Sequence, residues 1–254
     1  MSFSHLPPEL LTNIFVLLDP PSLFHLCLTS STCYNVIKRH EGRLCRAIAA
    51  RHTLPQYPHL ASIPPVQWLQ VRWHRHQLNT ALSSTVDPAD LGWKGRHQDL
   101  VPAFRHALDI LWTYGDAMEG KLVEPAADPL RNWINTTSLE KIDVMSMHVS
   151  MYAGMLMRLS PHYGREETDP MPAHEMALTK GIPFLVAALV DGAEEAVGVV
   201  RKAYAPESAV DRGLKSAVRR LDRERNRKVG VIESLLGVVF ERAGGPRELA
   251  CRLT

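Results

Sequence analysis

The chain has few cysteines and little net charge, and each scarcity excludes a class of protein. Its four cysteines show no C-x-x-C spacing, and they indicate buried thiols in a reducing compartment. The formal charge of +2 creates no field over the whole molecule. The balance of charges alone therefore implies neither a nucleic acid nor a membrane as a partner.

Long apolar runs and targeting signals are also missing. The longest apolar run, Ile182 to Val190, is bounded by Gly181 and Asp191 and is too short to span a bilayer. The first residues lack the basic segment, apolar stretch and small-residue cleavage site of a secretory signal. We therefore expect an intracellular protein, located in the cytoplasm, the nucleus or both, with no membrane partner.

Patterns typical of strands and of repeats do not occur either. No segment sustains the alternation of apolar and polar residues, bounded by turn dipeptides, that predicts strands. No repeat of fixed period is present, which excludes leucine-rich and propeller arrays. We therefore predict an all-α protein with a short N-terminal helical module followed by a larger helical domain.

What the sequence does contain is a strongly apolar beginning. A helical stripe with the spacing i, i+1, i+4, i+5 and i+8 is formed by Leu10, Leu11, Ile14, Phe15 and Leu18. Pro7 and Pro8 suit the first turn of a helix, and Pro20 ends it. The spacing predicts one amphipathic helix between these prolines.

Two shorter apolar stripes follow this helix. Leu23 and Leu26 form one, and Cys33, Tyr34 and Ile37 form the next, with the polar residues 29–31 as helix caps between them. Fully burying each large apolar side chain stabilises by roughly 1.5–3 kcal/mol, and three such short helices cannot cover all of them. A second body must therefore cover the rest, either the remainder of the chain or another protein.

The whole ordered pattern resembles an F-box, particularly in the form found in fungal F-box proteins. The resemblance covers about a fifth of the chain and is carried by Leu6-Pro7-x-Glu9-Leu10-Leu11-x-x-Ile14-Phe15-x-x-Leu18-Asp19-Pro20-x-Ser22-Leu23-x-x-Leu26-x-Leu28-Thr29-Ser30, with Tyr34 and Ile37 behind it. It departs from many members at residues 29–34, where they have a valine, a cysteine, a basic residue and a tryptophan. The other interpretation of residues 6–37 is the N-terminal part of an ordinary helical core.

The resemblance implies a non-catalytic function. An F-box docks on the adaptor subunit of a cullin-RING (SCF) ubiquitin ligase, and the rest of the chain holds a protein substrate. It implies that docking is carried by Leu6, Pro7, Leu10, Leu11, Ile14, Phe15, Leu18, Leu23 and Leu26. The alternatives are an F-box interaction protein acting outside a ligase and a helical-domain enzyme of unrecognised type.

Proline positions suggest how the domains are divided. Four prolines fall between Thr53 and Pro65, which is typical of a linker. We therefore predict an F-box module over residues 1–52, a linker over 53–65 and a helical domain over 66–254.

Within the larger domain the spacing predicts a series of helices. Expected helices cover residues 65–82, 99–118, 138–159, 171–178, 182–204, 206–228, 229–242 and 247–252, while 121–135 is expected to be mostly loop. Thr137 to Glu140 has the S/T-x-x-E pattern of a capping box at the start of one of them.

Catalytic and metal-binding patterns are weak. There is no H-E-x-x-H, no P-loop and no G-x-G-x-x-G after a strand. Ser138 and Lys141 fit S-x-x-K, but the two companion motifs of that enzyme class are missing and helix capping already explains the serine. We therefore predict no catalytic residue, no cofactor and no metal site.

One segment near the C-terminus is markedly basic. It includes Arg212, Lys215, Arg219, Arg220 and Arg223. The simplest interpretation is a solvated helix face, with Glu224 and Lys228 paired four residues apart. The functional hypothesis is a strip that docks acidic or phosphorylated segments of a partner, since guanidinium groups match phosphate geometry. Nucleic acid is less favoured, because no aromatic residue is interleaved to stack on bases.

Overall fold

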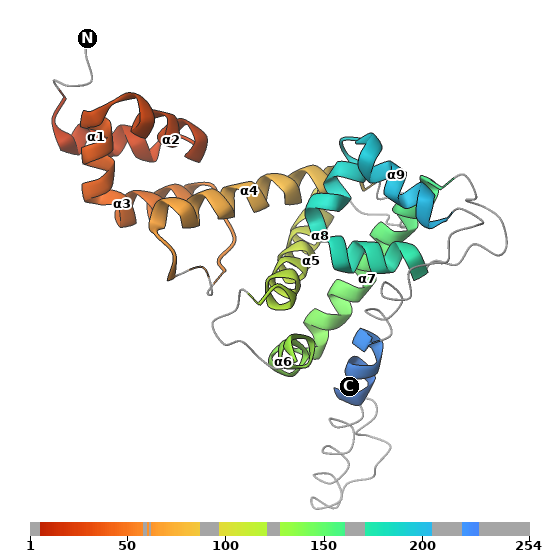
Figure 1. The fold of residues 1–254 in the computed structure, drawn as a ribbon. Coiled ribbons are helices and arrows are strands. Elements are labelled where there is room, and N and C mark those ends of the chain that lie inside the picture. Colours follow the sequence, from red (N-terminus) through yellow and green to blue (C-terminus); the bar gives the residue numbers. More distant parts are fainter. Residues whose placement is uncertain are drawn as a thin grey trace, which may run out of the picture. The chain divides into compact units, whose positions relative to one another are not determined.

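The computed structural model describes residues 6–57, 60, 62–86, 97–120, 128–160, 171–204 and 220–228. Helices make up most of these ranges, and no strand occurs within them. The predicted all-α fold is therefore confirmed (Figure 1). Also within these ranges, no helix is both long and apolar enough to cross a membrane.

The chain divides into two compact units. Unit 1 is Met1–Thr80 and unit 2 is Ala81–Thr254, so helix α4 (Pro65–Ser84) crosses the division. This division falls later than the domain boundary predicted at residues 53–65, which stays a prediction.

Three N-terminal helices begin unit 1: α1 (Pro8–Val16), α2 (Pro20–Thr29) and α3 (Ser31–Arg51). A proline stands at the first helical position of α1, as the sequence predicts, and another at that of α2, where Pro20 had been interpreted only as the end of the preceding helix. The Ser30 hydroxyl caps α3 by accepting a 3.3 Å hydrogen bond from the backbone N–H of Cys33. The stripe of Cys33, Tyr34 and Ile37 lies in the first part of α3, and the helix continues beyond it through a kink at His40 (φ −113°, ψ 15°).

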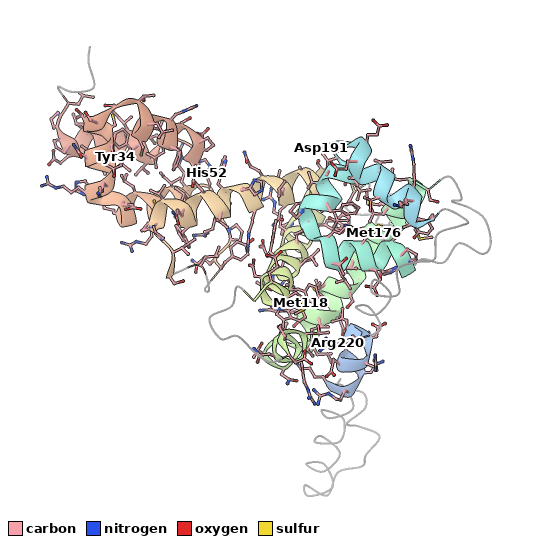
Figure 2. All side chains as sticks on the ribbon, in the orientation of Figure 1. Tyr34, His52, Met118, Met176, Asp191 and Arg220 are labelled. Carbon is pink, nitrogen blue, oxygen red and sulfur yellow. The ribbon has the colours of Figure 1, made fainter. Side chains whose placement is uncertain are left out.

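Unit 1 has its own hydrophobic core, and its side chains fill the space between the helices (Figure 2). The buried members come from α1, α2, α3, the following segment and α4: Leu11, Phe15, Leu23, Cys33, Ile37, Leu44, Cys45, Ile48, Ala49, Leu54 and Leu69. Leu54 lies in the predicted linker and Leu69 in the predicted second domain. Arg72 also donates hydrogen bonds to the carbonyls of Leu54 and Pro55. The linker residues and the start of α4 therefore belong to the packing of unit 1.

Unit 2 contains α5 (His97–Met118), α6 (Pro129–Thr136), α7 (Leu139–Arg158), α8 (Met171–Leu189) and α9 (Glu194–Ala203), and residues 220–228 are also helical. Helix α7 packs against both α5 and α8. The core of unit 2 includes Leu108, Ile134, Ile142, Met145 and Leu156, which are fully buried or nearly so.

Helix α6 was not predicted, because Pro129 was interpreted as a helix breaker. In the structure it is the first residue of α6, where its missing N–H costs nothing. The Asp128 carboxylate caps the helix by accepting a 3.2 Å hydrogen bond from the backbone N–H of Arg131. The expectation of loop over residues 121–135 was therefore wrong for 129–135, and 121–127 lie outside the described residues.

The start of α7 differs by one residue from the predicted capping box. Ser138, not Thr137, is the N-cap, and its hydroxyl accepts a 3.4 Å hydrogen bond from the backbone N–H of Lys141. Glu140 is therefore the second helical residue rather than the third, so the reciprocal half of the box is not formed.

The stretch predicted as helix over 182–204 is interrupted. Helix α8 runs through the predicted break with a kink at Gly181, and the chain leaves helical structure between Leu189 and Glu194. The helices expected over 229–242 and 247–252, and most of the one expected over 206–228, fall outside the described residues.

Two of the predicted buried thiols are confirmed. Cys33 and Cys45 are free and buried, and burial raises the pKa of Cys45 to about 12. Cys27 is half-buried, and burial raises the pKa of its thiol as well. Cys251 lies outside the described residues.

The kink at Gly181 generates a stability prediction. Its φ of 68° and ψ of −166° fall in a region open essentially to glycine alone. Gly181→Ala should lower the free energy of unfolding by about 1–3 kcal/mol, measured by urea denaturation. The control Gly154→Ala, inside α7 with open space around the added methyl group, should be neutral or stabilise by up to about 1 kcal/mol. Equal losses in the two variants would contradict this account of the kink.

Candidate partner-binding surface

Helix α1 separates its apolar residues onto two faces. Leu11 and Phe15 are 1% and 0% exposed and face the core of unit 1. Leu10 and Leu17, seven positions apart and so on one face, are 50% and 63% exposed. The core of unit 1 is thus complete while part of the stripe stays uncovered.

The nine residues predicted to dock a partner fall into three groups. Leu6, Pro7 and Leu10 are exposed. Half-buried at the edge of the core are Ile14, Leu18 and Leu26, and fully inside it are Leu11, Phe15 and Leu23. Their role in docking stays a prediction, but the last three are placed to shape the module rather than to touch a partner.

Four exposed large apolar residues of unit 1 are absent from the predicted docking set: Leu17, Phe24, Leu28 and Tyr34. Leu28 and Tyr34 were named only as part of the F-box-like pattern. Phe24 and Leu28 are four positions apart on α2, and Leu28 is 72% exposed. The spacing of Phe24 and Leu28, like that of Leu10 and Leu17, is a helical signal that was available in the sequence.

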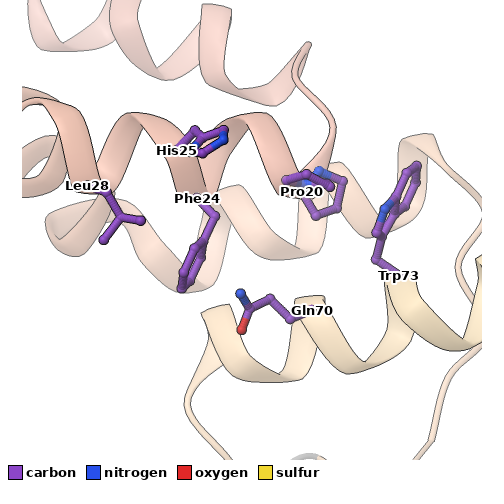
Figure 3. A pocket seen from close by; sticks show the side chains of 7 residues that line it. Pro20, Phe24, His25, Leu28, Gln70 and Trp73 are labelled. Atoms are coloured by element: carbon purple, nitrogen blue, oxygen red, sulfur yellow. The ribbon is translucent and has the colours of Figure 1, made fainter.

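A groove of about 330 Å³ adjoins this exposed face. Its walls are α2 and α4, and it is lined by Pro20, Pro21, Phe24, His25, Leu28, Gln70 and Trp73. Figure 3 shows Phe24 and Leu28 pointing from α2 toward α4, with Trp73 of α4 beside Pro20. The groove extends the uncovered apolar surface onto a helix beyond the F-box-like pattern.

A carboxylate fixes the turn between α1 and α2. Asp19 is the N-cap of α2 and accepts a 2.7 Å hydrogen bond from the backbone N–H of Ser22. Hydrogen bonds from Ser22 lower the pKa of Asp19. The cap therefore helps to set where the exposed side chains of α2 begin.

The basic segment is only partly described. Arg212, Lys215 and Arg219 lie outside the described residues. Arg220 begins the helix 220–228 (Figure 2), and Arg223 lies within it. Arg220 forms an ion pair with Asp128. Arg223 is exposed. The acidic-partner strip as a whole stays a prediction.

Several basic side chains of helix 220–228 bind other residues of unit 2. The Nε of Arg225 donates to Asp143 at 2.6 Å, and Lys228 Nζ donates to the carbonyls of Ile134, at 2.5 Å, and Thr137. Glu224 pairs with Arg227 at 2.9 Å, so the predicted pair of Glu224 with Lys228 is wrong. Leu221, 3% exposed, supplies an apolar anchor. These contacts tether helix 220–228 to α6 and α7.

Asp128 takes part both in the N-terminal cap of α6 and in the contacts that hold helix 220–228. The backbone N–H of Arg131, and after it the guanidinium of Arg220, lowers the pKa of the Asp128 carboxyl. Since the pKa is lowered in the folded protein, the stabilisation exists above the unfolded pKa and is lost as the pH falls through the folded value. The cap of α6 and the tether should therefore weaken together in acid.

Titratable groups inside unit 2 are shifted chiefly by burial. Burial raises the pKa of Tyr114 to about 12, raises that of Tyr152 and lowers that of His148. Tyr114 packs edge-on against Trp133 with ring centroids 5.2 Å apart. These shifts are typical of core packing rather than of an acid and base tuned by charged partners. Within the described ranges no cluster of three metal-ligating side chains occurs.

The burial of Phe15 generates a prediction about unit 1. Phe15→Ala should lower the free energy of unfolding by about 3–5 kcal/mol, because it leaves a cavity in a closed core. Leu28→Ala, at an exposed position, should change it by no more than about 0.5 kcal/mol. Denaturation followed by circular dichroism measures both. A mild effect of Phe15→Ala would mean that the side chain is not part of the core.

The tether generates a second prediction. Lys228→Ala should cost about 1 kcal/mol, since it removes charge-assisted bonds to two carbonyls at a partly exposed site. Arg223→Ala, on the same helix, should lie within about 0.5 kcal/mol of wild type. Indistinguishable midpoints of thermal unfolding for the two variants would count against the tether.

Comparison with known proteins identifies a domain family for the N-terminal helices. Residues 3–44 match the family model of the F-box domain. No curated protein and no solved structure gave a significant match. The match ends within α3, so α4 and all of unit 2 lie beyond it. The resemblance carried by the leucines and prolines of α1 and α2 is therefore confirmed, and the chain carries an F-box domain at residues 3–44.

Proposed function

We propose that this protein is a substrate-recognition subunit of an SCF-type ubiquitin ligase. Its F-box domain implies an adaptor role in such a ligase. In this proposal the domain docks on the ligase adaptor subunit, and unit 2 holds a protein substrate. Holding both on one chain raises the concentration of the substrate near the catalytic subunits without any new contact between them.

The observation that carries the proposal is that α1 and α2 bear two sets of apolar side chains, one buried in the core and one exposed. Leu11, Phe15 and Leu23 close the core, while Leu10, Leu17 and Leu28 are left in water. Covering a fully exposed leucine stabilises a complex by roughly 1.5–3 kcal/mol. A few such residues in one patch can offset the cost of association, which is the pattern of binding hot spots.

The docking residues proposed here refine the predicted set. Direct contact is assigned to Leu6, Pro7, Leu10, Leu17, Phe24 and Leu28, with edge contacts from Ile14, Leu18 and Leu26. Leu11, Phe15 and Leu23 act indirectly, by holding α1 and α2 in place.

Other parts of the proposal follow from the family rather than from this chain. F-box proteins are typically non-catalytic adaptors, so the proposed function includes no chemical step and no cofactor. It also places the protein inside the cell, in the cytoplasm or the nucleus. The division into module, linker and substrate domain belongs to the same proposal.

Binding to a purified SCF adaptor subunit tests the proposal. The double variant Leu10→Ala with Leu28→Ala should bind at least tenfold more weakly than wild type in calorimetry, a loss of about 1.4 kcal/mol or more. Its midpoint of thermal unfolding should be unchanged, because both side chains are exposed.

A matched control removes exposed apolar side chains from unit 2. Met147→Ala with Val190→Ala, 63% and 38% exposed in the native protein, should bind the adaptor within twofold of wild type. No binding by wild type would overturn the proposed ligase function. Equal loss in both double variants would overturn the docking surface.

A further inference from the structure

Charge is distributed unevenly between the two units. Unit 1 carries seven Lys and Arg against three Asp and Glu, a net charge of +4, whereas the whole chain carries only +2. Unit 2 is therefore net negative, at −2. The excess of positive charge lies on the unit that contains the F-box domain.

Four of the seven cations of unit 1 have contacts within the unit. Arg72 stacks 4.2 Å from the centre of the Trp68 ring, and Arg75 lies 4.6 Å from that of Tyr57. Lys38 lies over the Tyr34 ring at 5.6 Å. The fourth, Arg51, donates to the backbone carbonyl of Val16 at 3.3 Å.

The other three cations are Arg39, Arg43 and Arg46 of α3, here called the arginine face. All three are exposed, and within the described part of the chain none of them has an acidic or hydrogen-bonding partner. Few carboxylates compete nearby: Asp19 caps α2, and Glu41 accepts a 3.1 Å hydrogen bond from the backbone N–H of Val66.

The arginine face looks away from the core of unit 1. Each arginine is two positions from a buried residue: Ile37 before Arg39, Cys45 after Arg43, and Leu44 before Arg46. Residues two apart point to opposite sides of a helix. The buried side of α3 packs against α1 and α2, so the arginine face lies on the other side of unit 1 from those helices.

The three side chains are also close enough to act together. Arg39 and Arg46 are about two helical turns apart, roughly 11 Å along the axis, with the kink at His40 between them. The guanidinium of Arg46 folds back over Gly42, since a Cβ there would lie 4.0 Å from both of its terminal nitrogens. That position brings its charge toward Arg39 and Arg43.

We propose that the arginine face binds an acidic segment of a partner protein. Planar guanidinium groups bind carboxylates through paired hydrogen bonds, and here three of them have no such partner. An extended peptide covers 11 Å in roughly three to four residues. The segment recognised is therefore one with about three Asp or Glu residues clustered over four or five positions.

A protein segment fits this surface better than a nucleic acid does. Duplex-binding proteins make on the order of 6–10 phosphate contacts, and the arginine face offers three cations. Single strands are held by aromatic side chains on which bases stack, and Tyr34, the one Phe, Tyr or Trp residue of α3, already lies under Lys38. The small net charge of the whole chain adds no long-range attraction for a polyanion.

The test uses the full chain and a fluorescent twelve-residue peptide with three aspartates in five positions. Fluorescence anisotropy at low salt should show at least tenfold tighter binding than to the same peptide with asparagines. The variant Arg39→Glu, Arg43→Glu, Arg46→Glu should lose at least tenfold in affinity, and raising the salt concentration should weaken wild-type binding in the same direction.

The control reverses three exposed cations of unit 2, Lys141→Glu, Arg201→Glu and Lys202→Glu, for an equal change in net charge. It should bind the acidic peptide within twofold of wild type. If the charge-reversed α3 variant does not fold, Arg39→Gln, Arg43→Gln, Arg46→Gln replaces it, with the same loss expected. Adaptor binding within twofold of wild type in the α3 variant separates this surface from the docking surface.

Three outcomes would overturn the proposal. They are equal losses in the two charge-reversed variants, equal binding of the aspartate and asparagine peptides, and tighter binding of an RNA or DNA oligonucleotide that the α3 variant abolishes. Failure of wild type to bind the adaptor would overturn the ligase function and leave the arginine face standing.

Discussion

The structure of unit 1 depends on packing α3 against α1 and α2. Short helices have too little surface on one side to bury every apolar residue they carry, so each must divide its leucines between an inner and an outer set. Leu11, Phe15 and Leu23 meet Ile37, Leu44 and Ile48 in a closed core, and the outer set on α1 and α2 remains in water. The same packing turns the opposite side of α3 outward, which gives the arginine face its position. Both proposed partner surfaces therefore follow from one constraint.

Much of the fold was predictable from periodicity and capping. The helices of unit 1, α5 and most of α7 begin and end near the predicted residues, because prolines and short polar caps act locally. Errors arose where one residue type has two local meanings. A proline can break a helix or occupy its first turn. Pro129 occupies the first position of α6, because Asp128 before it caps the helix. The place of Leu54 and Leu69 in the core of unit 1 depends on contacts distant in sequence, which local patterns do not contain.

The candidate sites show the same limit more sharply. A stripe containing Leu10 and Leu11 predicts a helix, but which of two adjacent leucines faces inward depends on where α3 lies. Which basic residues are free to bind a partner was harder still to predict. The segment around Arg220 is the most basic in the sequence, yet Arg225 and Lys228 donate hydrogen bonds to residues 82–94 positions away. The three arginines of the arginine face are less concentrated in the sequence, yet they are exposed and have no ion pair or hydrogen bond within the described residues.

The central claim is that α1 and α2 keep one apolar set for their own core and offer another to a foreign subunit. Hydroxyl-radical footprinting of the full chain, with and without the SCF adaptor subunit, measures this side chain by side chain. The account predicts that Leu10, Leu17 and Leu28 are oxidised in the free protein and protected in the complex, while Leu11 and Phe15 stay unreactive in both. Continued oxidation of the outer leucines in the complex, or oxidation of Phe15 in the free protein, would contradict it.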